Sequence, residues 1–175
     1  MKDRKLLNIE LGRLSPEDYR TRRAPSGVVL VLDNVRSAHN VGSAFRTADA
    51  FGVDKVFLGG ICPCPPSAAL HKVALGAEES VPSEPVPDVP ALIRALQSRG
   101  YTAVAVEQTV HSVKLDAFRP EPGRKYALVF GNEVEGVQQE VVDACDFSLE
   151  IPQRGTKHSL NVSVSVGVVL WALVQ

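Results

Sequence analysis

Three short segments of the sequence combine glycine with polar side chains that can hold a ligand. They are residues 34–42, 131–136 and 153–161. In or next to them lie amide, carboxylate, hydroxyl and guanidinium groups that we take as candidate site residues: Asn40, Arg46, Glu133, Ser159 and Asn161. Such groups accept hydrogen bonds from a ligand or pair with its negative charge. The segments therefore predict a polar ligand site.

The first segment leads into Asn40-Val-Gly-Ser-Ala-Phe-Arg46, which has helical spacing. An Asn that opens a helix leaves N–H groups and a positive dipole end next to it, and Gly42 allows a ligand to approach closely. Asn40 and Arg46 do not share one face, but a long arginine on the first turns still reaches the preceding loop. A capped helix with a surface arginine explains these residues about equally well.

The other two segments offer a carboxylate and a hydroxyl–amide pair. Glu133 can accept hydrogen bonds from a ligand or hold an arginine, and Arg154 and Lys157 can contact phosphate. The simpler alternatives are a strand-to-helix turn with solvated carboxylates and a glycine loop that leads into a capped helix. The first alternative suits a single glycine better than Gly-Asn-Glu followed by a second glycine.

Each segment follows a predicted strand. These strands are Gly27–Asp33, Tyr126–Phe130 and Phe147–Ile151. Ligands of parallel sheets bind outside the carboxyl ends of the strands. The three segments are therefore expected to form one composite site.

Strands and helices alternate along the chain, which predicts an α/β fold with a mostly parallel sheet and helices on both faces. The remaining predicted elements are strands at Lys55–Leu58 and Tyr101–Val106, helices at Asn40–Phe51, Ala68–Gly76, Val89–Arg99 and Gln138–Ala144, and an extended connection at Val81–Pro90. The C-terminal SLNVSVSVGVV alternates polar and apolar residues, which favours a strand. Ser159 or Asn161 can equally cap a final helix that runs to Leu173.

Composition indicates one soluble domain. The 175 residues are 45% hydrophobic with a net charge of −1, enough for a single core. Residues 1–25 carry a local net charge of +3, which suits either steering toward phosphate or a solvated helix. With neither a signal peptide nor a membrane-spanning run, we expect a cytoplasmic protein without membrane contact.

Several function classes find no support in local motifs. The sequence has no GxGxxG after a strand, no GxxxxGK[ST], no GxSxG and no His-Glu-x-x-His. Cys62 and Cys64 are too close for an ordinary zinc knuckle, and a further ligand would have to come from His71 or from farther away. We therefore expect reduced cysteines and no metal site.

Taken together and in this order, the three segments resemble the signature motifs of the SpoU (TrmH-like) family of RNA ribose 2′-O-methyltransferases, within the SPOUT superfamily. The resemblance covers about Val28 to Leu173. It implies a three-layer α/β/α sandwich whose C-terminal segment forms a deep trefoil knot, with helix from Leu160 onward. It also implies a homodimer, and a division into a basic N-terminal arm (1–25) and a SPOUT methyltransferase domain (26–175).

The resemblance also implies the cofactor and the residue roles. S-adenosyl-L-methionine would bind through the backbone of Gly131, Ile151 and Leu160. The five candidate site residues would be catalytic: Arg46 central, Asn40 orienting it or the ribose, Glu133 holding Arg46 or the substrate, and Ser159 and Asn161 completing the pocket. Because arginine stays protonated, stabilising the oxyanion suits Arg46 better than acting as a base.

The predicted activity is methylation of a ribose 2′-hydroxyl in tRNA or rRNA, with a weak preference for a guanosine in tRNA. The alternative is a non-catalytic RNA-binding or assembly factor that keeps the fold. The intact motif set argues against this alternative. A nucleotide- or nicotinamide-binding enzyme would rest on the fold class alone.

Overall fold

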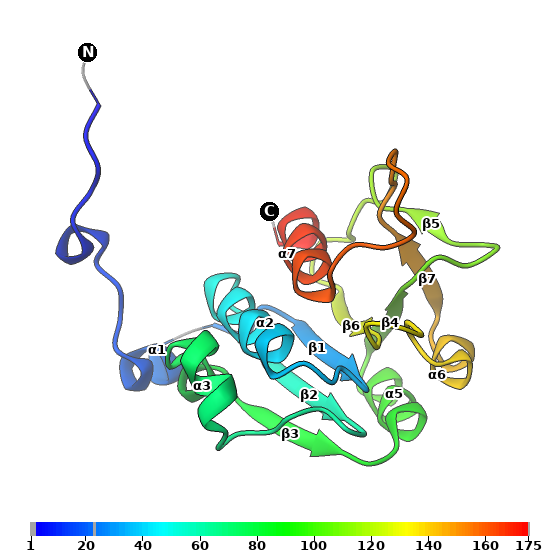
Figure 1. The fold of residues 1–175 in the computed structure, drawn as a ribbon, viewed down its shortest axis with the longest axis horizontal. Coiled ribbons are helices and arrows are strands. Elements are labelled where there is room, and N and C mark those ends of the chain that lie inside the picture. The colour runs from blue at the N-terminus through cyan, green and yellow to red at the C-terminus, as the bar shows by residue number, and fades with distance from the viewer. Residues whose placement is uncertain (1–2, 23, 175) are drawn as a thin grey trace.

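A computed structural model of the chain describes residues 3–22 and 24–174. Figure 1 shows a sheet with helices packed around it and an N-terminal segment that extends from the body. The elements are η1 (Asn8–Leu11), α1 (Pro16–Arg22), β1 (Val28–Asp33), α2 (Ala38–Ala50), β2 (Lys55–Gly59), α3 (Ala68–Ala74), α4 (Ala77–Ser80), β3 (Ser83–Val86), α5 (Val89–Ser98), β4 (Tyr101–Val106), β5 (Val113–Lys114), β6 (Lys125–Phe130), α6 (Gln139–Ala144), β7 (Phe147–Glu150) and α7 (Val162–Leu173).

The seven strands form one sheet in the order β3-β2-β1-β6-β4-β7-β5. Every strand pair in the described ranges is parallel, which confirms the α/β class. β1 lies near the centre, and all six of its residues are buried. Parallel strands covered on both faces read as continuous apolar runs, which is why VVLVLD was recognisable in the sequence.

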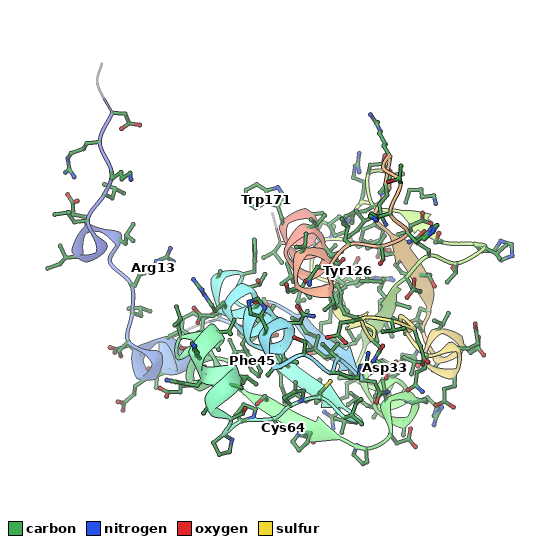
Figure 2. The ribbon with its side chains drawn as sticks, viewed as in Figure 1. Arg13, Asp33, Phe45, Cys64, Tyr126 and Trp171 are labelled. Carbon is green, nitrogen blue, oxygen red and sulfur yellow. The ribbon has the colours of Figure 1, made fainter. Side chains whose placement is uncertain are left out.

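Two hydrophobic clusters lie on opposite faces of the sheet. Leu30 and Leu32 of β1 belong to a cluster with residues of α2, α3 and α7, whereas Val29 and Val31 belong to a cluster with residues of α5 and α6. The labelled Phe45 is fully buried between α2 and the sheet (Figure 2). The arrangement confirms the three layers, α on β on α.

The sequence prediction missed two strands and one helix. Val81–Pro90 was expected to be only an extended connection, but Ser83–Val86 pairs with β2 as an edge strand. Its Pro85 is tolerated there because an edge strand need not donate on both sides. The predicted helix 68–76 ends at Ala74, since Leu75 and Gly76 adopt positive φ, and the short α4 follows. β5 has two residues and carried no readable pattern.

The C-terminus is a helix rather than a strand. Asn161 is its N-cap, and its side chain accepts from the backbone N–H of Ser163. The helix therefore begins at Val162, two residues after the start that the resemblance implied. The alternation of polar and apolar residues misled because the tertiary packing of Val166, Val169 and Leu170 decides the element.

Some expectations stay predictions. These include the knot and the boundary between a basic arm and a methyltransferase domain. Met1, Lys2, Arg23 and Gln175, which fall within those predicted ranges, lie outside the described residues. None of the helices in the described ranges combines the length and apolar composition needed to cross a bilayer.

Candidate active site

A cavity of about 270 Å³ lies where β4, β6 and β7 end. Its lining comes from residues 106–108, 130–136, 149–151 and 158–160, with three further residues, Gln153, Val162 and Ser165. The second and third polar segments therefore meet as predicted. The residues expected to bind the cofactor, Gly131, Ile151 and Leu160, all line this cavity.

Glu133 joins the first polar segment to the second. Its Oε1 accepts from the backbone N–H of Ser37 and from Nδ2 of Asn40, both at 3.0 Å, and its Oε2 accepts from the N–H of Arg36 at 3.1 Å. Partial burial raises the pKa of Glu133, but these hydrogen bonds outweigh it and hold the pKa below its ordinary value. The carboxylate is thus a fixed negative group at the start of α2, where the helix dipole favours one.

Asn40 extends this cluster to the third segment. Its Oδ1 accepts from Nδ2 of Asn161 at 3.1 Å, while its Nδ2 donates to Glu133. The helix N-cap is Ser37, whose side chain accepts from the N–H of Asn40. The expectation that Asn40 opens the helix was therefore wrong, because Ser37 is an equally good cap and the helix starts at Ala38. Asn40 lies one turn inside and is free to bridge the other two segments.

A buried acidic residue anchors the same edge of the sheet. Asp33, the last residue of β1, is fully buried (labelled in Figure 2) and accepts from the backbone N–H of Gln138 and from Nδ2 of Asn34, both at 2.9 Å. Burial raises the pKa of Asp33, and the two hydrogen bonds offset part of that rise. Asn34 also accepts from Asn132 through its backbone carbonyl at 2.8 Å. The ends of β1 and β6 are thereby locked together.

Arg46 stands apart from this cluster. It is exposed on α2, and within the described ranges no hydrogen bond or ion pair joins it to Glu133 or to another residue. Glu133 is engaged with Asn40 and the start of α2 instead. Arg46 is thus an exposed cation on α2 that is not engaged by another described residue.

Ser159 and Leu160 belong to an open loop. Residues 152–160 are all exposed. Among the described residues, a single hydrogen bond ties this stretch to the rest of the chain, from Nε2 of Gln108 to the carbonyl of His158 at 2.6 Å. The Ser159 side chain therefore lines the cavity without a fixed partner.

Sequence reasoning missed Glu107 and Gln108. Both line the cavity directly after β4. The rule that polar residues after a strand form the site of a parallel sheet points to them, but no glycine accompanies them, so their sequence pattern does not single them out.

The cavity is acidic. Four of its lining residues are glutamates (Glu107, Glu133, Glu135 and Glu150), and none of the described residues that line it is a lysine or an arginine. Glu150 is paired with Lys114 and accepts from Ser112, which lowers its pKa. Such a lining favours a ligand that carries positive charge and hydrogen-bond donors.

The cysteines are not arranged around the cavity. The Cys62 thiol is buried, accepts from the N–H of Val35 and donates to the carbonyl of Leu32, both at 3.2 Å. Burial raises its pKa to about 12, so it is a protonated core thiol. His71 pairs with Glu78 at 2.5 Å rather than with the cysteines.

Fold and site together define a parallel α/β protein with a composite ligand cavity at the carboxyl edge of its sheet. The match to a known family is specific: the SpoU rRNA Methylase family matches residues 27–171. This chain belongs to that family.

Several relatives are similar over most of the chain. The 23S rRNA (guanosine-2′-O-)-methyltransferase RlmB of Vibrio cholerae is 36% identical over 148 residues, which are 85% of this chain and 59% of the relative. The crystal structure of a TrmH/SpoU tRNA modifying enzyme from A. aeolicus is 28% identical with a TM-score of 0.77, covering 90% of this chain and 77% of that one. An AdoMet-bound rRNA methyltransferase from Sinorhizobium meliloti is 26% identical with a TM-score of 0.76, covering 86% and 60%. This chain thus spans about three fifths of the length of the curated relative.

Proposed function

We propose that this chain transfers a methyl group from S-adenosyl-L-methionine to a ribose 2′-hydroxyl in RNA. The observation that carries the proposal is the meeting of the second and third motif segments at one cavity, with the first segment joined to both by the hydrogen bonds Asn161–Asn40–Glu133. Family membership and the names of the relatives point to the same reaction.

The cavity suits the cofactor in shape and charge. A side chain at Gly131 has no room, since its Cβ would lie 2.0 Å from the carbonyl carbon of Gly136. Backbone groups therefore line this wall, as expected for a ligand held by the main chain. The acidic lining suits a sulfonium cation. When bound, S-adenosyl-L-methionine supplies a methyl group already activated by the positive sulfur.

The protein's own part is alignment and electrostatics. The guanidinium of Arg46 offers N–H donors and no acceptor, so it stabilises the negative charge that develops on the ribose oxygen, and the hydroxyl proton passes to a phosphate of the RNA or to water. Glu133 and Asn161 hold Asn40 in place, and Asn40 orients the ribose. Ser159 closes the pocket from the open loop. Positioning of this kind can supply a large share of the rate enhancement.

The decisive experiment is methyl transfer to RNA. Purified protein is incubated with S-adenosyl-L-methionine that carries a labelled methyl group, with unmodified rRNA and unmodified tRNA in separate reactions. We expect label in one RNA, and a loss of about 100-fold or more in Arg46→Ala, whose fold and cofactor binding stay intact. Arg94→Ala is the matched control, because it removes an exposed arginine from α5 on the opposite face of the sheet. RNA binding without cofactor binding would contradict the proposal and favour a non-catalytic RNA-binding factor.

The class of RNA is the finer part of the proposal. The Vibrio cholerae relative is named for a guanosine of 23S rRNA, and the A. aeolicus structure is of a tRNA modifying enzyme. The sequence alone favoured tRNA weakly. The higher identity to the rRNA enzyme leads us to propose a guanosine in rRNA as the first substrate to test.

We also propose that the chain acts as a homodimer. Val164, Val168 and Trp171 are spaced four and three residues apart on α7 and are 50%, 38% and 63% exposed. Figure 2 shows Trp171 projecting from α7 at the edge of the molecule. An exposed apolar stripe of this kind favours an interface. A stable monomer in sedimentation would contradict the proposal, and Trp171→Ala is expected to weaken the dimer.

A further inference from the structure

Glu107 is a carboxylate of the cavity that neither the three motifs nor the proposed mechanism uses. It follows Val106 directly at the carboxyl end of β4, and its side chain is half-buried. It lines the cavity next to the segment that carries Gly131. A half-buried carboxylate in the wall of a ligand cavity is positioned to contact the ligand.

Two backbone groups fix the orientation of this carboxylate. Oε1 accepts from the N–H of Gln108 at 2.7 Å, and Oε2 accepts from the N–H of Val137 at 3.0 Å. A carboxylate has about four acceptor sites. Within the described ranges these two hydrogen bonds use one site on each oxygen. Each oxygen therefore keeps one acceptor site, and the two oxygens belong to one carboxylate.

Glu107 is packed against backbone that cannot move aside easily. A Cβ at Gly136 would lie 2.2 Å from Oε2 of Glu107, and Gly136 has a φ of +72°. Gly131 packs just as tightly against Gly136 and Val137. Glu107 is thus built into the same wall as the glycine expected to hold the cofactor.

The neighbouring residue ties this wall to the opposite side of the cavity. Gln108 donates to the carbonyl of His158, next to Ser159 and Leu160. The segment after β4 therefore bridges the two segments that surround the ligand.

We propose that Glu107 binds the ribose of the cofactor, with its two remaining acceptor sites taking the hydrogens of the vicinal 2′ and 3′ hydroxyls. The inference rests on the proposed function, because the cofactor is what brings this ribose to the cavity. Two adjacent donors on the ligand match two adjacent acceptors on one carboxylate. An acidic side chain near a strand end binds ribose hydroxyls in the same way in dinucleotide-binding sheets.

The other glutamates of the cavity are less suited to this role. Glu133 is occupied by Asn40 and the start of α2, and Glu150 by Ser112 and Lys114. The Glu135 side chain has no hydrogen bond to a described residue and is exposed. Glu135 adds negative charge to the cavity, but its carboxylate is not held in one orientation. It is therefore the matched control for the loss of a cavity charge.

Isothermal titration calorimetry with S-adenosylhomocysteine and its 2′-deoxy and 3′-deoxy analogues tests the proposal without turnover. For the parent protein we expect each deoxy analogue to bind roughly 10- to 100-fold more weakly than the full ligand. Glu107→Gln is expected to lower the affinity for the full ligand by a similar factor and to bind the deoxy analogues nearly as well as the full ligand. Glu135→Gln is expected to keep the parent's discrimination.

Each contrary result has its own meaning. A parent that binds the deoxy analogues as tightly as the full ligand overturns the proposal, whatever the variants do. The proposal is also overturned if Glu107→Gln discriminates against the deoxy analogues as strongly as the parent does. It is overturned as well if Glu107→Gln changes which nucleotide is methylated while its affinity for the cofactor stays unchanged. Should the parent fail to bind S-adenosylhomocysteine at all, the proposed function falls as well.

Discussion

The two sides of the cavity differ in how firmly the chain holds them. On one side, Glu133 accepts three hydrogen bonds that lock the start of α2, and Asn40 passes the connection to Asn161. On the other side, residues 152–160 are exposed and are tied down only through Gln108, within the described ranges. One half is preorganised and the other is open.

The difference indicates a division of work. Groups that must stand in fixed geometry for catalysis gain from rigid support, since misplacement costs rate. A loop with few contacts opens at little cost and admits ligands. Under the proposed function, the hydrogen-bonded half positions the reacting ribose and the open half admits the cofactor.

The strongest test compares a glycine from each half. In the hydrogen-bonded half, Gly131→Ala places a Cβ 2.0 Å from the carbonyl carbon of Gly136. In the open loop, the Cβ of Gly155→Ala meets no atom within 4 Å. We expect Gly131→Ala to lower the free energy of unfolding by about 3 kcal/mol or more, because backbone cannot yield as a side chain can. Gly155→Ala should change it by less than about 1 kcal/mol. Urea unfolding of both variants measures this, and equal losses would remove the distinction.

The next test breaks the link between the first and third segments. Asn161→Ala removes the N-cap of α7 and the hydrogen bond to Asn40, so we expect a loss of about 1–2 kcal/mol in unfolding free energy. Asn161→Asp keeps the cap acceptor but replaces the donor to Asn40 with a charged acceptor that faces Oδ1 of Asn40. A smaller loss of stability in Asn161→Asp, with methyl transfer still reduced, would assign the link with Asn40 to function. Identical behaviour of the two variants would argue for capping or packing alone.

Glu133 makes the stability of the hydrogen-bonded half depend on pH. Because its pKa is lowered in the folded state, its contribution to stability is present above its ordinary pKa of 4.5 and is lost as the pH falls through the folded value. Glu133→Gln should cost about 1 kcal/mol or less at neutral pH, since the side chain is exposed and water screens it. The difference from the parent should vanish in acid. Thermal unfolding from pH 7 to pH 3 measures it, with Glu135→Gln expected to run parallel to the parent.

The smallest effect on stability is expected in the open loop. Gln108→Ala removes the one hydrogen bond that joins residues 152–160 to the rest of the described chain. We expect the free energy of unfolding to change by less than about 1 kcal/mol. Trypsin should nonetheless cleave faster after Arg154 or Lys157, both of which lie in this loop. Gln153→Ala is the control in the same loop. Unchanged cleavage in Gln108→Ala would show that the loop is held by something other than this contact.

Much of the fold could be read from the sequence because burial on both faces leaves a clear mark. The apolar run of β1 and the polar residues after β6 and β7 were enough to predict where the segments would meet. The cap at Asn161 was one of two options, and only packing of α7 on the core decided for the helix.

The rest depended on three-dimensional context. Ser37 and Asn40 are both good caps, so spacing alone could not show that one starts the helix and the other reaches Glu133 and Asn161. Glu107 was overlooked because it has no glycine beside it. Its role depends on the backbone of Val137, which is distant in sequence and therefore invisible to any local pattern.

The central pairing of the sheet also bears on how the chain acquires its structure. β1 pairs with β6 from Val28–Tyr126 onward, so neighbouring strands join residues about 100 positions apart. Contacts this distant require loop-closure entropy to be lost before they stabilise anything, which slows folding. A growing chain can form β1, β2 and β3 with their helices early, but one edge of β1 must stay unpaired until β6 has been synthesised. During that interval a strand whose six residues are all buried in the finished fold presents an open edge to aggregation.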